Sequence, residues 1–305
     1  MKITINIFKK PLKNMKRIGL FLMTEKGLEV LRAFVANVGH EHVAFVVSAQ
    51  DGNVKNDYYK EISSLCKKHN IKFYNRDHKI LPASDYAFAI SWRWLIKDNS
   101  RLITLHDSLL PKYRGFSPLP TALINGEKHV GVTAFLVNEE FDAGEIVGQR
   151  KLKIHYPAKI QKVIESISKE YGKLVVEIAS KIIAGKKLPG RKQNDKAVTY
   201  SLWRDEDDYR INWSKDAPSI ERLVDAVGYP YKGASSLLDG HMVRIIEATA
   251  EPDVEIEDRA VGKVIFIRNG FPIIVCGSGL LKVTELTDDT GENLLPLKKF
   301  RSRFV

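Results

Sequence analysis

The chain has 305 residues, of which 44% are hydrophobic and 28% charged, and its formal net charge is +11. This composition excludes a disordered protein, and the length suffices for two domains of ordinary size. The positive charge suits anionic ligands, including nucleotide diphosphates and tRNA, and does not distinguish between them.

Cysteine content and hydropathy argue against a disulfide-rich, metal-binding, membrane-spanning or secreted protein. Cys66 and Cys276 lie far apart in unrelated contexts, which predicts single buried thiols and neither a disulfide framework nor a metal site. No apolar run reaches the length of a membrane span, and residues 1–17 lack the apolar core of a signal peptide. We therefore expect a cytoplasmic protein that requires neither a membrane nor a metal.

Strands and helices alternate in the first part of the chain. A buried strand at residues 17–23 is followed by a helical pattern from Thr24. Further strands are expected at residues 43–48, 72–74 and 86–91, with a helix at residues 58–69. This alternation predicts an α/β fold with a parallel sheet and right-handed crossovers. The first turn lacks a GxGxxG pattern, so a dinucleotide site is not supported.

The run Ser91 to Ile96 (SWRWLI) directly follows one of these strands. Its two tryptophans, Trp92 and Trp94, can line a pocket for a flat aromatic ligand, or they can pack on a following helix. Both interpretations remain open on the sequence.

The most informative segment runs from Thr104 to Gly144. His106 follows the apolar run LITL, and Pro111 and Gly115 then break the chain, so His106 should stand at the carboxyl end of a strand. Ligands of open α/β sheets bind at such ends. Asp142 follows a second apolar run and precedes Gly144, which lets its carboxylate reach the same crevice. A histidine oriented by a carboxylate is a general acid/base unit.

The second part of the chain is rich in predicted strands. An amphipathic helix at residues 160–183 is expected to end at Gly185, and a polar linker follows. Strands at residues 242–246, 262–267, 272–276 and 280–285, separated by turn glycines, favour a small β-barrel.

Several of these motifs occur in one order that resembles the folate-dependent formyltransferases, the family of methionyl-tRNA formyltransferase and the nucleotide-sugar N-formyltransferases. The matching residues are His106, Ser108 to Pro111, Arg114-Gly115, Gly131 to Thr133 and Asp142 to Gly144. The segments around Trp213 and Tyr229 to Ala234 resemble the carboxy-terminal domain of the same family.

The resemblance implies a Rossmann-like formyltransferase domain with a parallel sheet, followed by a smaller OB-like β-barrel domain. It divides the chain into an N-terminal extension (residues 1–14), a catalytic domain (15–185), a linker (186–198) and a C-terminal domain (199–305). His106, Asp142 and Thr104 fall on catalytic positions of the family. The implied cofactor-binding residues are Trp92, Trp94, Leu95, Ser108, Leu109, Leu110 and Pro111, while Arg114 is a candidate for binding an anionic part of either ligand.

Thr104 departs from the family pattern, because the family has an asparagine there that is thought to stabilise the oxyanion. Loss of one such donor typically costs on the order of 100 to 1,000-fold in rate. Threonine offers a shorter, single hydroxyl donor, so either other donors act on the oxyanion or the acyl donor or acceptor differs.

The resemblance implies transfer of a formyl group from 10-formyltetrahydrofolate, a cosubstrate, to a primary amine, without a metal. The favoured acceptor is a nucleotide-linked amino sugar, because the four acids at residues 205–208 would repel a tRNA backbone. Methionyl-tRNA is the alternative acceptor. A protein that binds folate or a nucleotide without catalysis is the alternative of another class.

Overall fold

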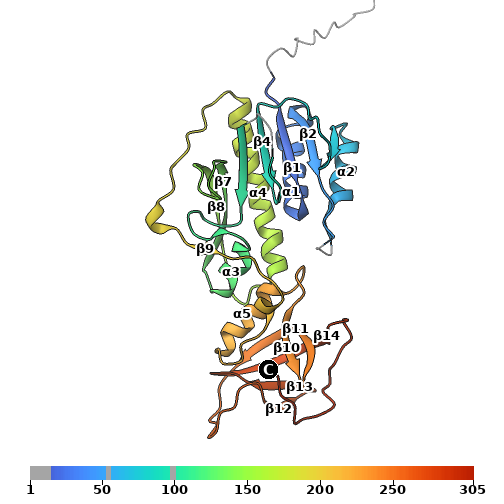
Figure 1. Cartoon of the computed structure of the whole chain (residues 1–305), viewed down its shortest axis with the longest axis vertical. Helices are drawn as coiled ribbons and strands as arrows, with labels where there is room; N and C mark the ends of the chain where they lie inside the picture. Colours follow the sequence, from blue (N-terminus) through green and yellow to red (C-terminus); the bar gives the residue numbers. More distant parts are fainter. Residues whose placement is uncertain (1–14, 53–55, 97–100) are drawn as a thin grey trace, which may run out of the picture.

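The computed structural model describes residues 15–52, 56–96 and 101–305, which form two units along the long axis of the molecule (Figure 1). The extension expected at residues 1–14 lies outside the described residues. The first unit contains a seven-stranded sheet of order β3-β2-β1-β4-β5-β7-β8, and the second a five-stranded sheet of order β10-β11-β14-β13-β12. This arrangement confirms the Rossmann-like α/β class and the smaller β unit, whereas the residue boundaries between domains stay predictions.

Most of the first sheet is parallel. Its parallel strands are β1 (Ile18–Leu22), β2 (Val43–Ser48), β3 (Phe73–Asn75), β4 (Tyr86–Ile90) and β5 (Arg101–His106). The last two strands, β7 (His129–Leu136) and β8 (Ile146–Lys153), instead run antiparallel. Between β5 and β7 the helix α3 (Pro118–Ile124) has only seven residues, about 10 Å, which is too short to carry the chain back along the sheet. Strand β7 therefore begins at the end of the sheet where β5 finishes, and it runs back antiparallel to β5.

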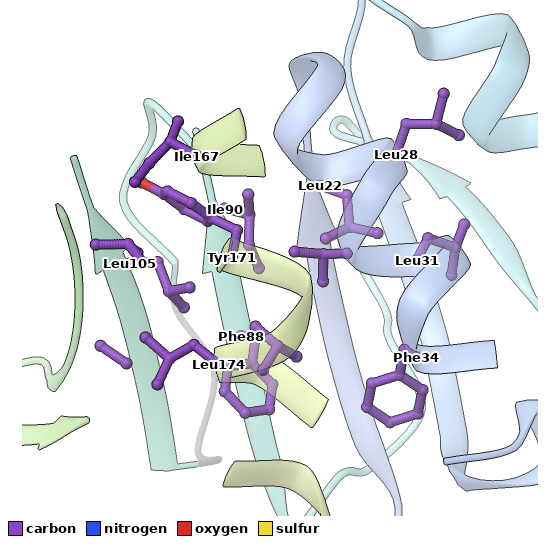
Figure 2. Close-up of a cluster of buried hydrophobic side chains, with 14 of the residues drawn as sticks. Leu22, Leu28, Leu31, Phe34, Phe88, Ile90, Leu105, Ile167, Tyr171 and Leu174 are labelled. Atoms are coloured by element: carbon purple, nitrogen blue, oxygen red, sulfur yellow. The ribbon is translucent and has the colours of Figure 1, made fainter. Parts of the chain in front are cut away.

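Three helices cover one face of this sheet. They are α1 (Thr24–Asn37), α2 (Tyr59–Lys68) and α4 (Ile160–Ile183), and α4 has the bounds that its periodicity predicted. Figure 2 shows α1 side chains such as Leu31 and Phe34, and the α4 side chains Tyr171 and Leu174, in the cluster they form with strand residues that include Phe88. Alternate residues of β1, β4 and β5 supply the strand side of this core, as the period of two in a strand requires.

Connecting segments, and not helices, cover the opposite face of the sheet in the described part of the chain. Its buried side chains include Phe21 and Phe45, and the partly buried residues packed on them, such as Leu81 and Trp92, come from connecting segments. None of the helices in the described ranges contributes to this cluster. Thr104 and His106 alternate with the core residues of β5, so they point to this helix-free face.

The second unit closes through the end of the chain. Its strands are β10 (Ala234–Leu238), β11 (His241–Glu251), β12 (Val264–Arg268), β13 (Phe271–Val275) and β14 (Leu280–Asp288). The segment of residues 302–305 bonds to both edge strands: Val305 and Leu237 exchange hydrogen bonds of 2.9 Å, and the Val264 amide donates to Ser302 at 3.2 Å. This segment joins β10 to β12 and gives the antiparallel sheet a barrel-like closure; the sequence predicted a barrel but not the segment that closes it.

Both cysteines fit their predicted places. Cys66 on α2 and Cys276 after β13 are buried and unpaired, and burial raises the pKa of each thiol to about 12. Within the described part of the chain, no helix combines the length and apolar character needed to cross a membrane.

Phe304 should be essential for stability of the second unit. It is 1% exposed and its ring lies 5.6 Å from that of Trp213, so Phe304→Ala should lower the free energy of unfolding by about 3–5 kcal/mol. Phe300→Ala is the control, because Phe300 is 51% exposed. Urea unfolding followed by circular dichroism measures both variants, and equal midpoints would refute the closing role of residues 302–305.

Candidate active site at the end of β5

His106 is the last residue of β5, and it is 9% exposed. Its Nε2 atom lies 2.7 Å from the carbonyl oxygen of Tyr113, and its Nδ1 atom lies 3.7 Å from Oδ2 of Asp142. A carbonyl oxygen can only accept, so Nε2 carries the proton of this hydrogen bond. The remaining nitrogen, Nδ1, faces the carboxylate of Asp142, and this arrangement is suited to a ring that gains a proton there.

Asp142 reaches His106 by a route that the sequence did not predict. Because β7 is antiparallel to β5, its last residue Leu136 pairs with Ile103 and not with His106. The connection at residues 137–145 folds back, with Asp142 in the left-handed region at φ 54°. The carboxylate accepts a hydrogen bond of 2.8 Å from the Gly115 amide. The predicted pair is brought together, but at a distance longer than a hydrogen bond.

Gln193 holds this connection in place. Its Nε2 atom donates to the carbonyl oxygens of Asp142 at 2.7 Å and Gly144 at 2.9 Å. Its Oε1 atom accepts two hydrogen bonds, of 3.1 and 2.8 Å, from the Arg114 guanidinium, which is also 3.8 Å from Asp195. Arg114 is only 7% exposed, so its observed partners are protein groups, and its predicted contact with substrate stays a prediction. Sequence reasoning placed Gln193 in a linker and gave it no role.

The Ser-Leu-Leu-Pro turn is fixed by β7 and β8. Thr133 accepts from the Leu110 amide at 3.1 Å and donates to the Ser108 carbonyl at 2.7 Å, while Gln149 donates to the Leu110 carbonyl at 2.8 Å. Ser108 and Leu110 are buried, whereas Leu109 and Pro111 are half-buried. The turn can therefore present to a cofactor the half-buried side chains of Leu109 and Pro111, together with those backbone groups that Thr133 and Gln149 do not bind.

An ion pair lies directly behind His106. The Asp107 carboxylate contacts Lys26 Nζ and accepts a hydrogen bond of 2.7 Å from the hydroxyl of Tyr171. Burial alone would raise the pKa of Asp107, but the charge of Lys26 and these hydrogen bonds outweigh it and lower the pKa. Burial and the neighbouring carboxylate raise the pKa of Tyr171 well above its ordinary value. Asp107 therefore adds a fixed negative charge next to His106. Its partners lie on α1 and α4, and no sequence pattern linked these helices to the end of β5.

The predicted cofactor-binding tryptophans lie on the helix-free face of the sheet. Trp92 packs edge-on against Phe21 and Trp94 at centroid distances of 5.3 and 5.1 Å, and Arg76 stacks 4.4 Å from the Trp94 ring. Leu95 is 89% exposed. Within the described residues no helix directly follows residues 92–96, and the packing partners of Trp92 come from strands and connecting segments. Thr104 shares this face, half-buried between Ala89 and Phe135 on the neighbouring strands.

Exposed apolar side chains lie on segments that adjoin Gly115 and Asp142, outside the predicted motif. The short strand β6 (Arg114–Gly115) pairs with β9 (Tyr200–Ser201) just beyond the Gly115 amide that binds Asp142. Large exposed apolar residues stand on or next to these segments, and we call them the apolar rim: Phe116, Phe141, Tyr200, Leu202 and Trp203. Nothing in their sequence spacing associated them with His106.

Comparison with known proteins assigns the family. A model described as formyl transferase matches residues 67–179, and a model described as formyl transferase, C-terminal domain, matches residues 204–302. The chain belongs to the formyltransferase family. Over the residues that the structure describes, no group of three or more histidine, cysteine, aspartate or glutamate side chains is arranged to hold a metal ion.

Formyltransferases with similar sequences include the methionyl-tRNA formyltransferase of Thermodesulfovibrio yellowstonii. It is 34% identical over 66% of this chain and 62% of its own length. The enzyme of the same name from Ralstonia nicotianae is 29% identical over 65% of this chain and 60% of its own length. The chain thus spans less than two thirds of the length of the curated relatives that it matches.

Solved formyltransferase structures share the fold of nearly the whole chain. The sugar 3N-formyltransferase WlaRD, solved with dTDP and 5-N-formyl-THF, has a TM-score of 0.68 at 18% identity, covering 94% of this chain and 99% of its own. The Helicobacter canadensis N-formyltransferase, in complex with folinic acid and dTDP-3-aminofucose, has a TM-score of 0.69 at 18% identity, with coverages of 88% and 99%. At this identity the likeness concerns the fold alone.

Lys26 should be required for the stability of the structure around His106. Lys26→Met removes the counterion of Asp107, which should cost about 3 kcal/mol in the free energy of unfolding at pH 7. The exposed pair of Lys173 with Glu170 supplies the control, Lys173→Met, which should change stability by less than about 1 kcal/mol.

The ion pair of Lys26 with Asp107 also makes the free energy of unfolding depend on pH. In the native chain the lowered pKa of Asp107 gives a stabilising contribution above about pH 4 that is lost as the pH falls. Without Lys26, burial raises the pKa of this carboxyl, so protonation at lower pH relieves the uncompensated charge. Urea unfolding between pH 7 and pH 5 should show the deficit shrinking, and a deficit that is constant over this range would contradict the assignment.

Proposed function

We propose that the chain transfers the formyl group of 10-formyltetrahydrofolate to a primary amine. The observation that carries the proposal is the approach of His106 Nδ1 to the Asp142 carboxylate at 3.7 Å, at the carboxyl end of a strand and within the motif of the family. Relatives by sequence bear the name of a formyltransferase, and WlaRD was solved with 5-N-formyl-THF.

The surroundings of His106 fit a flat cosubstrate. Trp92 and Trp94 lie on the same helix-free face as Thr104 and His106, and the Trp92 ring packs edge-on against both Phe21 and Trp94, which fixes it for stacking. We assign the pterin to this side, together with Leu95 and the half-buried Leu109 and Pro111. When bound, 10-formyltetrahydrofolate supplies the formyl carbon and the nitrogen that leaves it.

The roles of the protein groups follow from charge. The acceptor must present a neutral amine, because an ammonium has no lone pair. Attack on the formyl carbon makes the amine nitrogen positive, and His106 accepts its proton at Nδ1 and returns one to the leaving nitrogen. Asp142 stabilises the imidazolium, while the Tyr113 carbonyl holds Nε2. The Thr104 hydroxyl is the candidate donor to the developing oxyanion.

A nucleotide-linked amino sugar is the acceptor that we favour. The apolar rim offers Phe116, Tyr200 and Trp203 as stacking surfaces for a nucleobase close to Asp142. The acidic residues 205–208 follow the rim directly and disfavour a polyanion. The structural relative from Helicobacter canadensis was solved with dTDP-3-aminofucose. Methionyl-tRNA is the second candidate, favoured by the names of the relatives by sequence.

The test is a screen of dTDP- and UDP-linked amino sugars and of initiator methionyl-tRNA with 10-formyltetrahydrofolate, following release of tetrahydrofolate. Turnover should occur with an amino sugar, and His106→Asn and Asp142→Asn should each lower it by at least about 100-fold. His155→Asn, at an exposed position, is the matched control and should keep full activity. Turnover with tRNA alone would establish the second candidate, and folate binding with no turnover on any amine would establish a binding protein.

A separate prediction concerns the departure at Thr104. If its short hydroxyl handicaps an ordinary oxyanion site, Thr104→Asn supplies a longer amide donor and should raise turnover by up to about 100-fold. Thr249→Asn, exposed on β11, is the control substitution. Lower turnover of a well-folded Thr104→Asn variant with the same amine would contradict the hypothesis that Thr104 weakens an ordinary oxyanion site. It would indicate a site adapted to other chemistry.

A further inference from the structure

A cavity of about 550 Å³ lies between the two units, away from the His106 site. It is lined by the end of α3, by the segment of residues 204–216 and by α5 (Ala217–Val227), which stands between the units in Figure 1. Its size falls within the range of small-molecule sites. The two ends of helix α3 lie at different sites. Its last residue, Ile124, borders this cavity, whereas its first residues follow the β6 segment, whose Gly115 amide binds Asp142.

Positive charge dominates the lining. Four cationic side chains, Arg204, Arg210, Lys215 and Arg222, face two carboxylates, Asp208 and Asp216. Within the described ranges, none of the four cations lies within 4.0 Å of a carboxylate, although seventeen ion pairs of lysine or arginine occur elsewhere. By contrast, the buried Arg244 is paired with both Glu206 and Asp289. The cations of the cavity therefore lack the neutralisation that other cations of the chain have.

The two carboxylates are already committed to the backbone. Asp216 caps α5, accepting from the Ser219 amide at 2.9 Å and from its hydroxyl at 2.7 Å. Asp208 accepts from the Asp205 amide at 3.0 Å. Arg222 is linked to Asp216 through the shared Ser219 hydroxyl and not by a direct ion pair, and the net positive charge of the lining is left to an external anion.

Two arginines are held in place with donors to spare. The Arg222 Nε atom donates to the Ile124 carbonyl at 3.2 Å, and its Nη2 atom donates to Ser219 at 2.8 Å. Arg204 Nη2 donates to Thr121 at 3.2 Å, while its buried Nε atom has no hydrogen-bond partner. An unsatisfied buried donor in a native fold calls for an explanation, and an anion in the cavity would satisfy it.

We propose that this cavity binds the phosphate group of a small phosphorylated molecule. Arginine forks match phosphate oxygens in geometry and charge, and the apolar side chains of Ile124, Ile220 and Leu223 can cover the carbon part of such a ligand. A nucleic acid fits less well, because the acidic residues 205–208 adjoin the site. The cavity shares no lining residue with the proposed acceptor site, and binding there does not depend on formyl transfer.

The test is calorimetric titration of the full chain with inorganic pyrophosphate and with uridine diphosphate, in the absence of folate and amine. The wild-type chain should bind both, and R210E/K215E should weaken pyrophosphate binding by about 100-fold or more. Arg210 and Lys215 are exposed, so the variant should fold. K186E/K187E makes the same change in net charge at exposed positions outside the cavity and should bind like the wild type.

The outcomes separate the sources of the anion. Absence of pyrophosphate binding, or equal pyrophosphate affinities in wild type and R210E/K215E, overturns the proposal. Loss of pyrophosphate binding in R210E/K215E supports the cavity even where uridine diphosphate binding survives, because the proposed acceptor site can itself hold the nucleotide. If R210E/K215E unfolds, R210Q/K215Q replaces it, with about a tenfold weakening expected. Turnover assays on the same variants remain independent, so failure of formyl transfer would leave this binding result intact.

Discussion

The side-chain amide of Gln193 joins three segments on which the candidate active site depends. Its donor nitrogen fixes the carbonyls of Asp142 and Gly144, and its oxygen accepts both bonds from Arg114. Arg114 belongs to the short strand whose next residue, Gly115, donates to the Asp142 carboxylate. A neutral amide suits this position, because it donates and accepts at once and adds no charge beside the carboxylate. Without it, the connection that returns Asp142 to His106 would lose two of its hydrogen bonds to the rest of the chain.

The sheet has two unlike faces, and this asymmetry determines where ligands can bind. Three amphipathic helices seal one face with a continuous core, which leaves no room there. The other face is covered by connecting segments that carry Trp92 and Leu81, and it receives Thr104 and His106 from β5. The polar groups of the strand end thus open towards the more weakly covered side. The ion pair of Lys26 with Asp107 reaches the same strand end from the helical side.

Local patterns predicted what depends on local sequence. The helix at residues 160–183 has a continuous apolar stripe, and His106 follows an apolar run that ends at a turn, so both were placed correctly. The direction of β7 was not predictable, because its apolar residues suit either orientation and the short α3 decides the matter. Gln193, Tyr171 and the apolar rim act over separations of tens of residues, and polar or exposed side chains leave no periodic signal. The closing residues 302–305 are too short a segment to show alternation.

The closure of the second unit also bears on how this architecture can change over evolution. Because Leu237 on the first strand of the sheet bonds to Val305, the chain enters and leaves the barrel at neighbouring places. A unit with adjacent ends can be lengthened, replaced or transplanted with little disturbance to its host. None of the groups around His106 comes from its strands; they come from the first unit and from the segment that leads to α5. The barrel therefore has the properties of an exchangeable module, because neither the groups around His106 nor the residues that line the cavity at α5 come from its strands.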